Sequence, residues 1–310
     1  MIWLILAVSI FFTGCDSIKD LFIEEDLLKR PESKRCGECH RVIYSQWKES
    51  RHSKSWISED YKKRTENYRK VKCYSCHIPY QVDPLKEPDH RKKNRHDGVN
   101  CVSCHFKDET GSIHGGYDVF SPPHPSKKDT NYKRSEICGG CHKRTYQQWK
   151  SSKTEKSCQS CHMPSKKGYL IQKFPFQYLH LKKDIHNHSF PVPIPDKGSF
   201  DLKVKLEEDR IAVMLKNLKI PHSVPTADNG RPKYYVTVEL FNRGKPVYRE
   251  RYLITSKDPL NYREEKLIDF YIFEDFTHLK ITVERKLSWS KKREKVLEKT
   301  FRKGDILASP

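Results

Sequence analysis

Five copies of one short pattern, Cys-x-x-Cys-His, lie in the first half of this 310-residue chain and constrain its fold more than any other feature. Between the first and the last copy, each motif has only about 25 residues to itself, far too few to build a separate protein core. The fold of this region must therefore be built around whatever the motifs bind. The five motifs are Cys36/Cys39/His40, Cys73/Cys76/His77, Cys101/Cys104/His105, Cys138/Cys141/His142 and Cys158/Cys161/His162.

The histidine in each motif identifies the bound group. Paired cysteines at this spacing alone would suggest zinc or a redox disulfide. The chain has 15 histidines, so chance places one at a given position roughly 5% of the time, and five in five excludes coincidence. Cys-x-x-Cys-His attaches c-type haem: both thiols form thioethers, and the adjacent imidazole becomes the proximal iron ligand. We therefore predict five covalently attached haem c groups, which also supply the buried apolar surface.

The composition agrees with an interior that is not built from aliphatic side chains. Only 35% of the residues are hydrophobic and 32% are charged, although the chain has 16 Tyr and 14 Phe. A net charge of +20 raises the question of nucleic acid or an anionic membrane as partner. The basic residues are spread over the whole chain, however, and haem propionates offset part of the charge. We expect no nucleic-acid partner.

The N-terminus predicts export. Residues 2–14 form an uncharged apolar run that is short for a membrane span and suits an export signal. The run ends in FTGC, which resembles a bacterial lipoprotein signal with Cys15 as the lipidated residue. An ordinary signal or an uncleaved anchor is the alternative. We therefore expect a lipoprotein signal over 1–15, a polar tether over 16–35, and a membrane-anchored protein in the periplasm or at the cell surface.

One unit of sequence occurs twice around the haem motifs. CGECHRVIYSQWKESRH (36–52) and CGGCHKRTYQQWKSSKT (138–154) share their cysteines, their motif histidine, a tyrosine and a tryptophan in register. Residues 41–50 and 143–152 contain neither Gly nor Pro and are predicted to be helical, as are residues 61–71. The last position differs, because His52 is answered by Thr154.

The chain changes character at about residue 199, where the haem motifs stop. Short runs, several of them alternating between polar and apolar residues, are separated by turn signals and predict six strands. We expect a small antiparallel sandwich over 198–303, with the immunoglobulin fold as one candidate, after a Pro-rich linker. The fold class is α + β, with a multihaem, loop-rich, mostly helical domain over 36–190 before the sandwich. The six predicted strands are 200–208, 210–218, 233–241, 246–254, 267–273 and 278–287.

The pattern C-x-x-C-H-x-x-x-Y-x-x-W-x-x-S-x-H over residues 36–52 resembles the multihaem cytochrome c-554 family, which is similar in haem packing to pentahaem nitrite reductases and octahaem hydroxylamine oxidoreductases. The resemblance covers roughly residues 36–240. Further stretches of the same kind are HDGVNCVSCH (96–105), GSIHGG (111–116), CQSCHMP (158–164), HSFP (188–191) and PHSVPT (221–226).

The resemblance implies a second histidine ligand for each iron. The histidines at the matching positions are His52, His96, His114, His188 and His222, with His124 and His186 in reserve. No motif surrounds His90, His180 or His278. Methionine, the other common sixth ligand, is scarce: beyond Met1 there are only Met163 and Met214. We therefore expect mostly bis-histidine haems of low potential.

Three functions are compatible with these features. The first is a non-catalytic electron-transfer protein that links a membrane donor to a periplasmic or surface acceptor through redox partner proteins. The second is a reductase or oxidase of a small nitrogen or sulfur compound at one five-coordinate haem. The pentahaem nitrite reductases use Lys in place of one motif histidine, and no Cys-x-x-Cys-Lys occurs here. The third is a docking or structural subunit of a redox complex.

The missing histidine at Thr154 gives a specific expectation. A threonine hydroxyl is a poor haem ligand, so the equivalent iron must take a ligand from elsewhere in the chain. His222 lies in a predicted loop of the sandwich, between Pro221 and Pro225. We predict that the sandwich supplies this histidine as a distal ligand and is therefore part of the redox unit.

Overall fold

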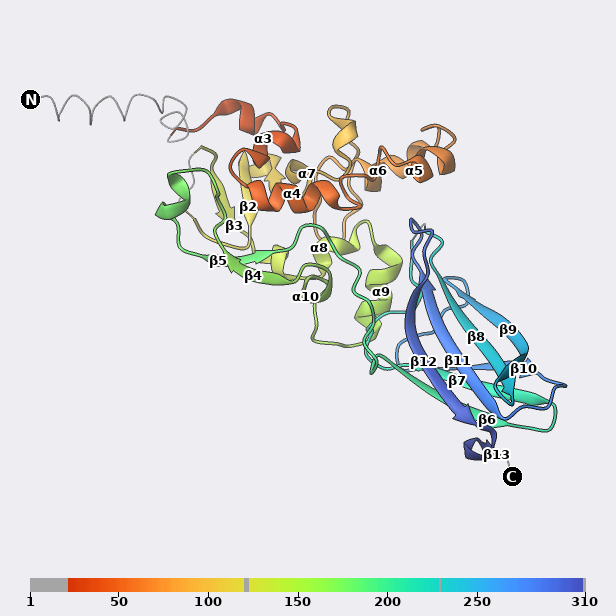
Figure 1. Ribbon diagram of the computed structural model, residues 1–310. Coiled ribbons are helices and arrows are strands. Elements are labelled where there is room, and N and C mark those ends of the chain that lie inside the picture. Colours follow the sequence, from red (N-terminus) through yellow and green to blue (C-terminus); the bar gives the residue numbers. More distant parts are fainter. Residues whose placement is uncertain (1–21, 120–122, 229, 309–310) are drawn as a thin grey trace, which may run out of the picture. The chain divides into compact units, whose positions relative to one another are not determined.

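The computed structural model describes residues 22–119, 123–228 and 230–308, so the predicted signal and Cys15 lie outside the described residues. Contacts divide the chain into two compact units, shown in Figure 1. The N-terminal unit comprises residues up to 141 and 156–192, and the C-terminal unit comprises 142–155 and the residues from 193 onward. Among the described residues, no helix is both long enough and apolar enough to cross a bilayer.

The N-terminal unit consists of short helices joined by loops. Helix α4 (Arg41–Glu49) has nine residues, and the other α-helices of the unit are only one or two turns long. Several of these turns contain a haem motif, so the motifs themselves are the main helix formers here. The other helices are α3 (Ser33–Gly37), α5 (Glu59–Arg64), α6 (Tyr74–His77), α7 (Cys101–His105), α8 (Glu136–Gly139) and α10 (Cys158–His162), with 3₁₀ turns at Glu25–Leu28, Val71–Cys73, Arg95–Asp97, Asp108–Thr110, Thr130–Lys133 and Phe176–Leu179.

Two small sheets, which the sequence did not predict, brace the loops of this unit. Strand β2 (Ser112–Gly115) pairs antiparallel with β1 (Phe106–Lys107) and parallel with β3 (Ser126–Lys128). Strands β4 (Ser165–Gly168) and β5 (Lys183–His186) form an antiparallel pair. Each sheet follows a haem motif directly, and each therefore fixes the chain where it leaves a motif.

The two repeated helices are confirmed, and the third predicted helix is wrong beyond its first turn. Helices α4 and α9 (Lys143–Ser151) occupy the predicted ranges. The segment predicted as helix over 61–71 leaves the helix after α5, because Glu66, Asn67 and Tyr68 all adopt positive φ. Three consecutive left-handed residues cannot continue a right-handed helix. By its contacts α9 belongs to the C-terminal unit, although its sequence lies inside the predicted haem domain 36–190.

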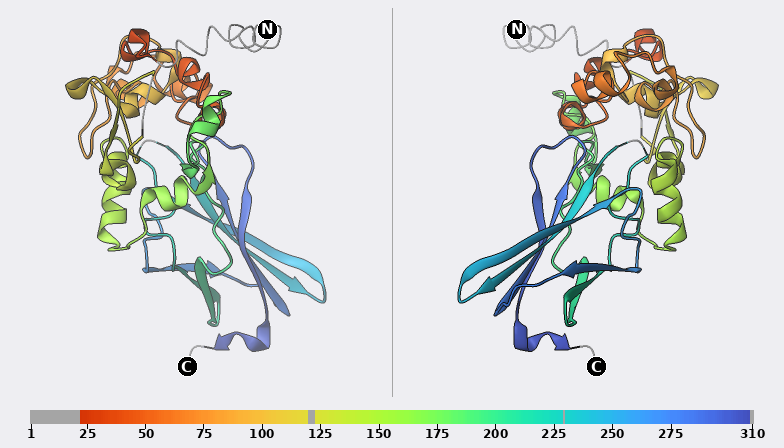
Figure 2. Two further views of the ribbon diagram at one scale, coloured as in Figure 1. Left: turned by 90° about the vertical axis from the view of Figure 1, so that its left-hand side faces the viewer. Right: turned by 90° about the vertical axis from the view of Figure 1, so that its right-hand side faces the viewer.

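The C-terminal unit is a sandwich of two four-stranded sheets, which confirms the predicted α + β class. One sheet has the order β10-β7-β6-β13 and the other β12-β11-β8-β9. Strands β8 and β9 form a long hairpin (Figure 2). Connections that cross between the sheets after β7, β9 and β10 give the arrangement of immunoglobulin-like sandwiches. The strands are β6 (Phe200–Leu206), β7 (Arg210–Asn217), β8 (Lys233–Asn242), β9 (Lys245–Thr255), β10 (Glu265–Tyr271), β11 (His278–Lys286), β12 (Glu294–Arg302) and β13 (Leu307–Ala308), with a 3₁₀ turn at Lys303–Asp305.

The sandwich core follows from the alternation in its strands. In β11 the residues alternate between buried and partly exposed from Leu279 to Arg285, so every second side chain points into the core. The six predicted strands are all present, and two further strands, β12 and the short β13, were not predicted. The buried hydrophobic core of this unit contains 23 residues.

Candidate functional site

Two of the haem motifs fold entirely as single helical turns. Helices α7 and α10 each begin at the first cysteine of a motif and end at its histidine. The residue before each helix caps it: the Asn100 side chain accepts the Ser103 amide, and the Ser157 side chain accepts the Ser160 amide. Residues three and four positions apart share one face of a helix, so both cysteines and the histidine can reach one ligand.

The first motif departs from this arrangement at its second cysteine. Helix α3 ends at Gly37, so Cys39 lies in the turn that follows it and not in a helix. Backbone bonds still fix that turn: the Cys39 amide donates to the Cys36 carbonyl at 3.3 Å, and the Cys39 carbonyl accepts the Gln172 amide at 2.8 Å. Cys39 is partly buried, and its predicted thioether bond to haem stays a prediction.

The fifth motif also differs from the others at its second cysteine, because this side chain is exposed. Cys161 is exposed, whereas the other nine motif cysteines are partly buried. Its Sγ lies 3.8 Å from the exposed Ser160 hydroxyl within α10. The haem predicted at this motif would therefore have the edge at Cys161 near the surface, unlike the enclosed haems that the composition led us to expect. The thioether bond at Cys161 likewise stays a prediction.

Four of the five motif histidines have Nδ1 at hydrogen-bond distance from a backbone carbonyl oxygen. An imidazole that donates Nδ1–H to a carbonyl is the tautomer that ligates a metal through Nε2, and such bonds also fix the ring orientation. The same arrangement at four separate motifs therefore fits proximal haem ligands. The four contacts are His40 to Leu170 (2.7 Å), His77 to Ser55 (2.8 Å), His105 to His114 (2.7 Å) and His162 to Pro191 (3.0 Å).

The fifth motif histidine, His142, faces a carboxylate in the C-terminal unit. Its Nδ1 lies 3.9 Å from Asp228 Oδ2. A carboxylate behind the imidazole makes a ligand more basic than a carbonyl does. His142 thus differs from the other four motif histidines, because the described group facing its Nδ1 is a carboxylate beyond hydrogen-bond distance and not a bonded backbone carbonyl.

Two of the motif histidines lie opposite a second histidine ring. The ring centroids of His40 and His124 are 6.4 Å apart, and those of His105 and His188 are 6.2 Å apart. Two imidazoles bound to opposite faces of one metal ion, at about 2.0 Å each, place their centroids about 6.3 Å apart. Both measured separations match this value, so each pair of imidazoles would fit one iron between them.

Burial keeps these four imidazoles neutral, as metal ligation requires. It is the main cause that lowers the pKa of His40 and of His105. Burial, with the nearby His40, lowers the pKa of His124 to about 4. Burial and the nearby His105 lower the pKa of His188 to about 4 as well.

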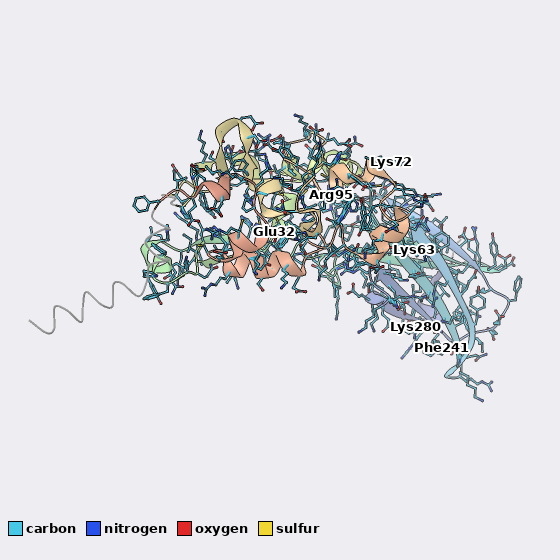
Figure 3. The ribbon with its side chains drawn as sticks, turned by 90° about the horizontal axis from the view of Figure 1, so that it is seen from above. Glu32, Lys63, Lys72, Arg95, Phe241 and Lys280 are labelled. Atoms are coloured by element: carbon cyan, nitrogen blue, oxygen red, sulfur yellow. The ribbon has the colours of Figure 1, made fainter. Side chains whose placement is uncertain are left out.

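The remaining predicted distal histidines lie in different surroundings. The His52 ring packs edge-on against Phe190 at 4.2 Å. His96 is largely exposed, with Nε2 3.5 Å from Glu32, which Figure 3 labels beside Arg95. Both ring nitrogens of His114 have side-chain partners: Nε2 lies 2.8 Å from Thr110 Oγ1 and Nδ1 lies 3.2 Å from Asp129.

His186 and His222 share the feature found at the motif histidines. Nδ1 of His186 lies 2.8 Å from the Met163 carbonyl oxygen, next to the fifth motif. Nδ1 of His222 lies 2.9 Å from the Ser223 carbonyl oxygen. Both rings are therefore held in the tautomer that ligates through Nε2.

Cysteines of different motifs lie close together inside the N-terminal unit. The Cys101 side chain is the hydrogen-bond partner that raises the pKa of Cys36. Likewise, Cys158 raises the pKa of Cys138, and Cys76 raises that of Cys141. Motif 1 therefore adjoins motif 3, motif 4 adjoins motif 5, and motif 2 adjoins motif 4.

Within the C-terminal unit, the loop that carries His222 contacts the helix after the fourth motif. Thr226 Oγ1 lies 2.9 Å from Thr145 Oγ1 and donates to Gln148 Oε1 at 2.8 Å. The Arg144 amide donates to Asp228 Oδ1 at 2.8 Å. The PHSVPT stretch attracted attention only through its histidine, and no role was predicted for Thr226 or Asp228. The only sequence signal for Thr226 is its place directly after Pro225 in this stretch.

Comparisons with known proteins found a similar family and a similar fold. Residues 35–106 and 137–182 match the family described as Cytochrome c554 and c-prime. A penta-heme cytochrome c552 from Thermochromatium tepidum shares the fold, with a TM-score of 0.60 and 16% identity over 88% of this chain and 100% of that one. A comparison with curated protein sequences found no match.

Fold, motifs and family match together define a multihaem c-type cytochrome. The match to the cytochrome c554 family, which the sequence resemblance predicted, covers residues 35–106 and 137–182 and supports a multihaem c-type cytochrome of that family. The chain carries covalently bound haem c and takes part in electron transfer. The iron of haem c supplies a one-electron redox centre, and the residues described above would hold it.

Proposed function

We propose that this protein is an exported pentahaem cytochrome that relays electrons through mostly bis-histidine, low-potential haems, between a membrane donor and a periplasmic or surface acceptor. The observation that carries the proposal is the presence of two histidine pairs with ring centroids 6.4 and 6.2 Å apart. A six-coordinate iron has no open position for substrate, so such a haem transfers electrons without chemistry on a ligand.

The two pairs assign ligands to two haems. His124 would serve the haem at motif 1 opposite His40, and His188 would serve the haem at motif 3 opposite His105. His188 belongs to the set of five that the resemblance implies. His124 is one of the two reserves, and its pairing with His40 moves it into the ligand set.

The cysteine contacts support an order for the haems. Thioether bonds fix a haem edge at each motif, so motifs whose cysteines touch bring their haem edges together. The contacts link motif 1 to motif 3, motif 2 to motif 4, and motif 4 to motif 5. Cys104 of motif 3 also acts electrostatically on Cys138 and Cys141 of motif 4. All five haems would thereby form one connected cluster.

The exposed cysteine of the fifth motif suggests where the cluster meets its redox partners. Cys161 is exposed, and a thioether bond there would bring one haem edge to the surface. Electrons enter and leave a haem protein most readily through such an edge. The haem at motif 5 is therefore our candidate for the terminal haem of the relay.

The sandwich would provide a distal ligand, His222, for the haem at motif 4. His222 is carried by the loop that bonds to α9 through Thr226, and α9 begins directly after His142. We expect His222→Ala to convert one low-spin haem to a high-spin haem, seen by electron paramagnetic resonance. Thr226→Val serves as the matched control, because it removes the loop contact and keeps the imidazole.

The cellular setting is proposed from the sequence. Haem c in bacteria is attached outside the cytoplasm, and the apolar run before Cys15 provides an export signal. A lipid at Cys15 would hold the protein at the membrane beside its donor. Cys15→Ala should release the protein into the soluble fraction, or block its processing; unchanged membrane attachment would reject the anchor.

Carbon monoxide tests the relay directly against an enzyme with an open haem. We expect the intact mass to exceed the polypeptide by five haems and the reduced protein to bind no carbon monoxide. Stoichiometric binding at one haem would identify an open iron, and the function as a reductase or oxidase would then replace the relay.

A further inference from the structure

Arg91 is a charged side chain inside the N-terminal unit, with only 7% of its surface exposed. Its guanidinium donates to four oxygens from three separate segments. Nη1 donates to the Pro79 carbonyl at 3.2 Å and to Ser103 Oγ at 3.1 Å. Nη2 donates to the Asn94 carbonyl at 3.0 Å and to the Gly98 carbonyl.

These segments all belong to the proposed haem sites. Pro79 follows motif 2 by two residues, Ser103 lies between the two cysteines of motif 3, and Asn94 and Gly98 flank the loop of His96. Ser103 Oγ bonds in turn to the Pro79 carbonyl and to Asn100 Oδ1. One planar guanidinium therefore ties the exit of motif 2 to the interior of motif 3.

None of the described acceptors of Arg91 is a carboxylate, and its buried Nε has no acceptor among the described residues. Burial lowers the pKa of Arg91 to about 10, which still leaves it charged at neutral pH. Among the nearby groups, Asp97 favours the charge most, Cys104 favours it less, and Arg30 opposes it. A buried charge without a bonded counter-ion is costly, so its retention calls for a role beyond packing.

A positive charge beside a haem favours the reduced iron, because reduction lowers the positive charge of the centre by one. In a protein interior with an effective dielectric constant of about 20, a unit charge roughly 10 Å away changes such an equilibrium by about tenfold. For a one-electron couple, a tenfold change corresponds to about 59 mV.

We propose that Arg91 is a positioning residue that locks motif 2 to motif 3 and raises the reduction potential of the haem held by Cys101, Cys104 and His105. The inference rests on the proposed function, in which each motif holds a haem. If one haem of a low-potential cluster has a higher reduction potential than the others, that haem is reduced first.

The test is a spectroelectrochemical titration of the full-length, haem-loaded protein. Arg91→Gln should lower one midpoint potential by about 59 mV, a tenfold shift of its redox equilibrium. Arg91→Lys keeps the charge and loses the planar fork, so it should keep the potential and lower the melting temperature. Arg30→Gln is the matched control: Arg30 bonds to the Asp108 carboxylate at 2.8 Å, so its charge is already offset and the shift should be smaller.

Arg91→Gln with a full haem complement and unchanged potentials would overturn the proposal. If that variant fails to take up its haems, Arg91→Lys decides: unchanged potentials with a lower melting temperature support the proposal, and shifted potentials or an unchanged melting temperature reject it. The intact mass of the wild type separates this outcome from a failure of the proposed function, because a protein with fewer than five haems would contradict the pentahaem relay whatever Arg91 does.

Discussion

The two units of this protein bury their apolar side chains in very different ways. In the C-terminal unit, 23 buried hydrophobic residues form one continuous cluster between the two sheets. In the N-terminal unit, the corresponding cluster has three members, Trp56, Tyr61 and Ile78, with the other buried apolar side chains scattered along the described chain. The sandwich supplies its own core, whereas the haem-binding unit is built to enclose a core that its side chains do not provide.

The basic side chains, in contrast, make similar contacts in the two units. Figure 3 labels Lys63, Lys72 and Arg95 in the segment around motif 2, and Arg95 lies over the Trp56 ring at 5.7 Å. In the sandwich, Lys280 pairs with Glu239 at 2.8 Å on the surface of β11 and β8. The same Lys280 lies over the Phe241 ring at 5.6 Å, so basic side chains contact aromatic rings in both units.

Withholding haem should produce the largest effect. Without haem the N-terminal unit loses its core, because a chain of this composition cannot bury enough apolar surface alone. We expect amides of 33–190 to exchange at unfolded rates in haem-free protein, while those of β7, β8 and β11 stay protected. Hydrogen exchange read by mass spectrometry checks this, and protection of the haem motifs without haem would contradict the comparison.

A cavity in the sandwich should affect only that unit. Phe270 is 1% exposed, so Phe270→Ala should destabilise the C-terminal unit by about 3–5 kcal/mol. Denaturant unfolding followed by circular dichroism measures the loss. Phe273, which is 88% exposed, gives the control, and Phe273→Ala should change the unfolding free energy by less than about 0.5 kcal/mol. Equal effects of both substitutions would show that the cluster is not a packed core.

A smaller effect on stability is expected from an ion pair that joins the segment between motifs 2 and 3 to the residues after motif 3. The buried Lys107 ammonium lies 2.7 Å from Asp83. Burial raises the pKa of Asp83, but the bonds from Lys107 and Gln81 outweigh it, and the pKa lies below its usual value. This stabilisation is present above the unfolded pKa of about 3.9 and is lost as the pH falls through the lower folded value.

Asp83→Asn should therefore destabilise the N-terminal unit at neutral pH by about 1–2 kcal/mol, less than a fully buried pair because Asp83 is partly exposed. The difference from the wild type should shrink as the pH falls below 4, seen in melting curves monitored by haem absorbance. Glu59→Gln, which breaks the exposed pair with Lys62, is the control and should have no measurable effect. If the difference in stability between Asp83→Asn and the wild type did not change with pH, the loss of stability would come from packing and not from the charge of Asp83.

The sequence was sufficient for the haem motifs and for most of the sandwich. Cys-x-x-Cys-His requires no tertiary information, and alternation identifies six strands. Strand β12 was missed because four of the nine residues of EKVLEKTFR are Glu or Lys, which favour helices, and pairing with β11 makes it a strand. The end of α5 depends on positive φ at Glu66 to Tyr68, which no residue there announces.

The differences among the motifs were not visible in the sequence. All five share one pattern, yet Cys39 lies in a turn after its helix and Cys161 is exposed at the end of its unit's last motif. The exposure of a cysteine depends on which distant segments cover its motif, and the motif sequence does not predict those segments.

The histidine pairs could not be predicted from the sequence because they form between distant parts of the chain. His124 lies in a Pro-rich stretch with no helix or strand period, so nothing in its neighbourhood points to His40. Thr226 and Asp228 contact α9, the helix that follows the fourth motif, because the sandwich loop folds onto it within the C-terminal unit. Arg91 is one basic residue among many in the sequence, and only its burial distinguishes it.

Carbon monoxide titration of the reduced protein tests most directly whether paired imidazoles ligate the irons of the haems that form the core of the N-terminal unit. The account predicts no binding by the wild type, and one equivalent in each of His124→Ala and His188→Ala. His278→Ala, at the exposed first residue of β11, is the control and should bind none. If neither His124→Ala nor His188→Ala gains a binding site while both keep five haems, the two pairs do not ligate iron and the account is contradicted.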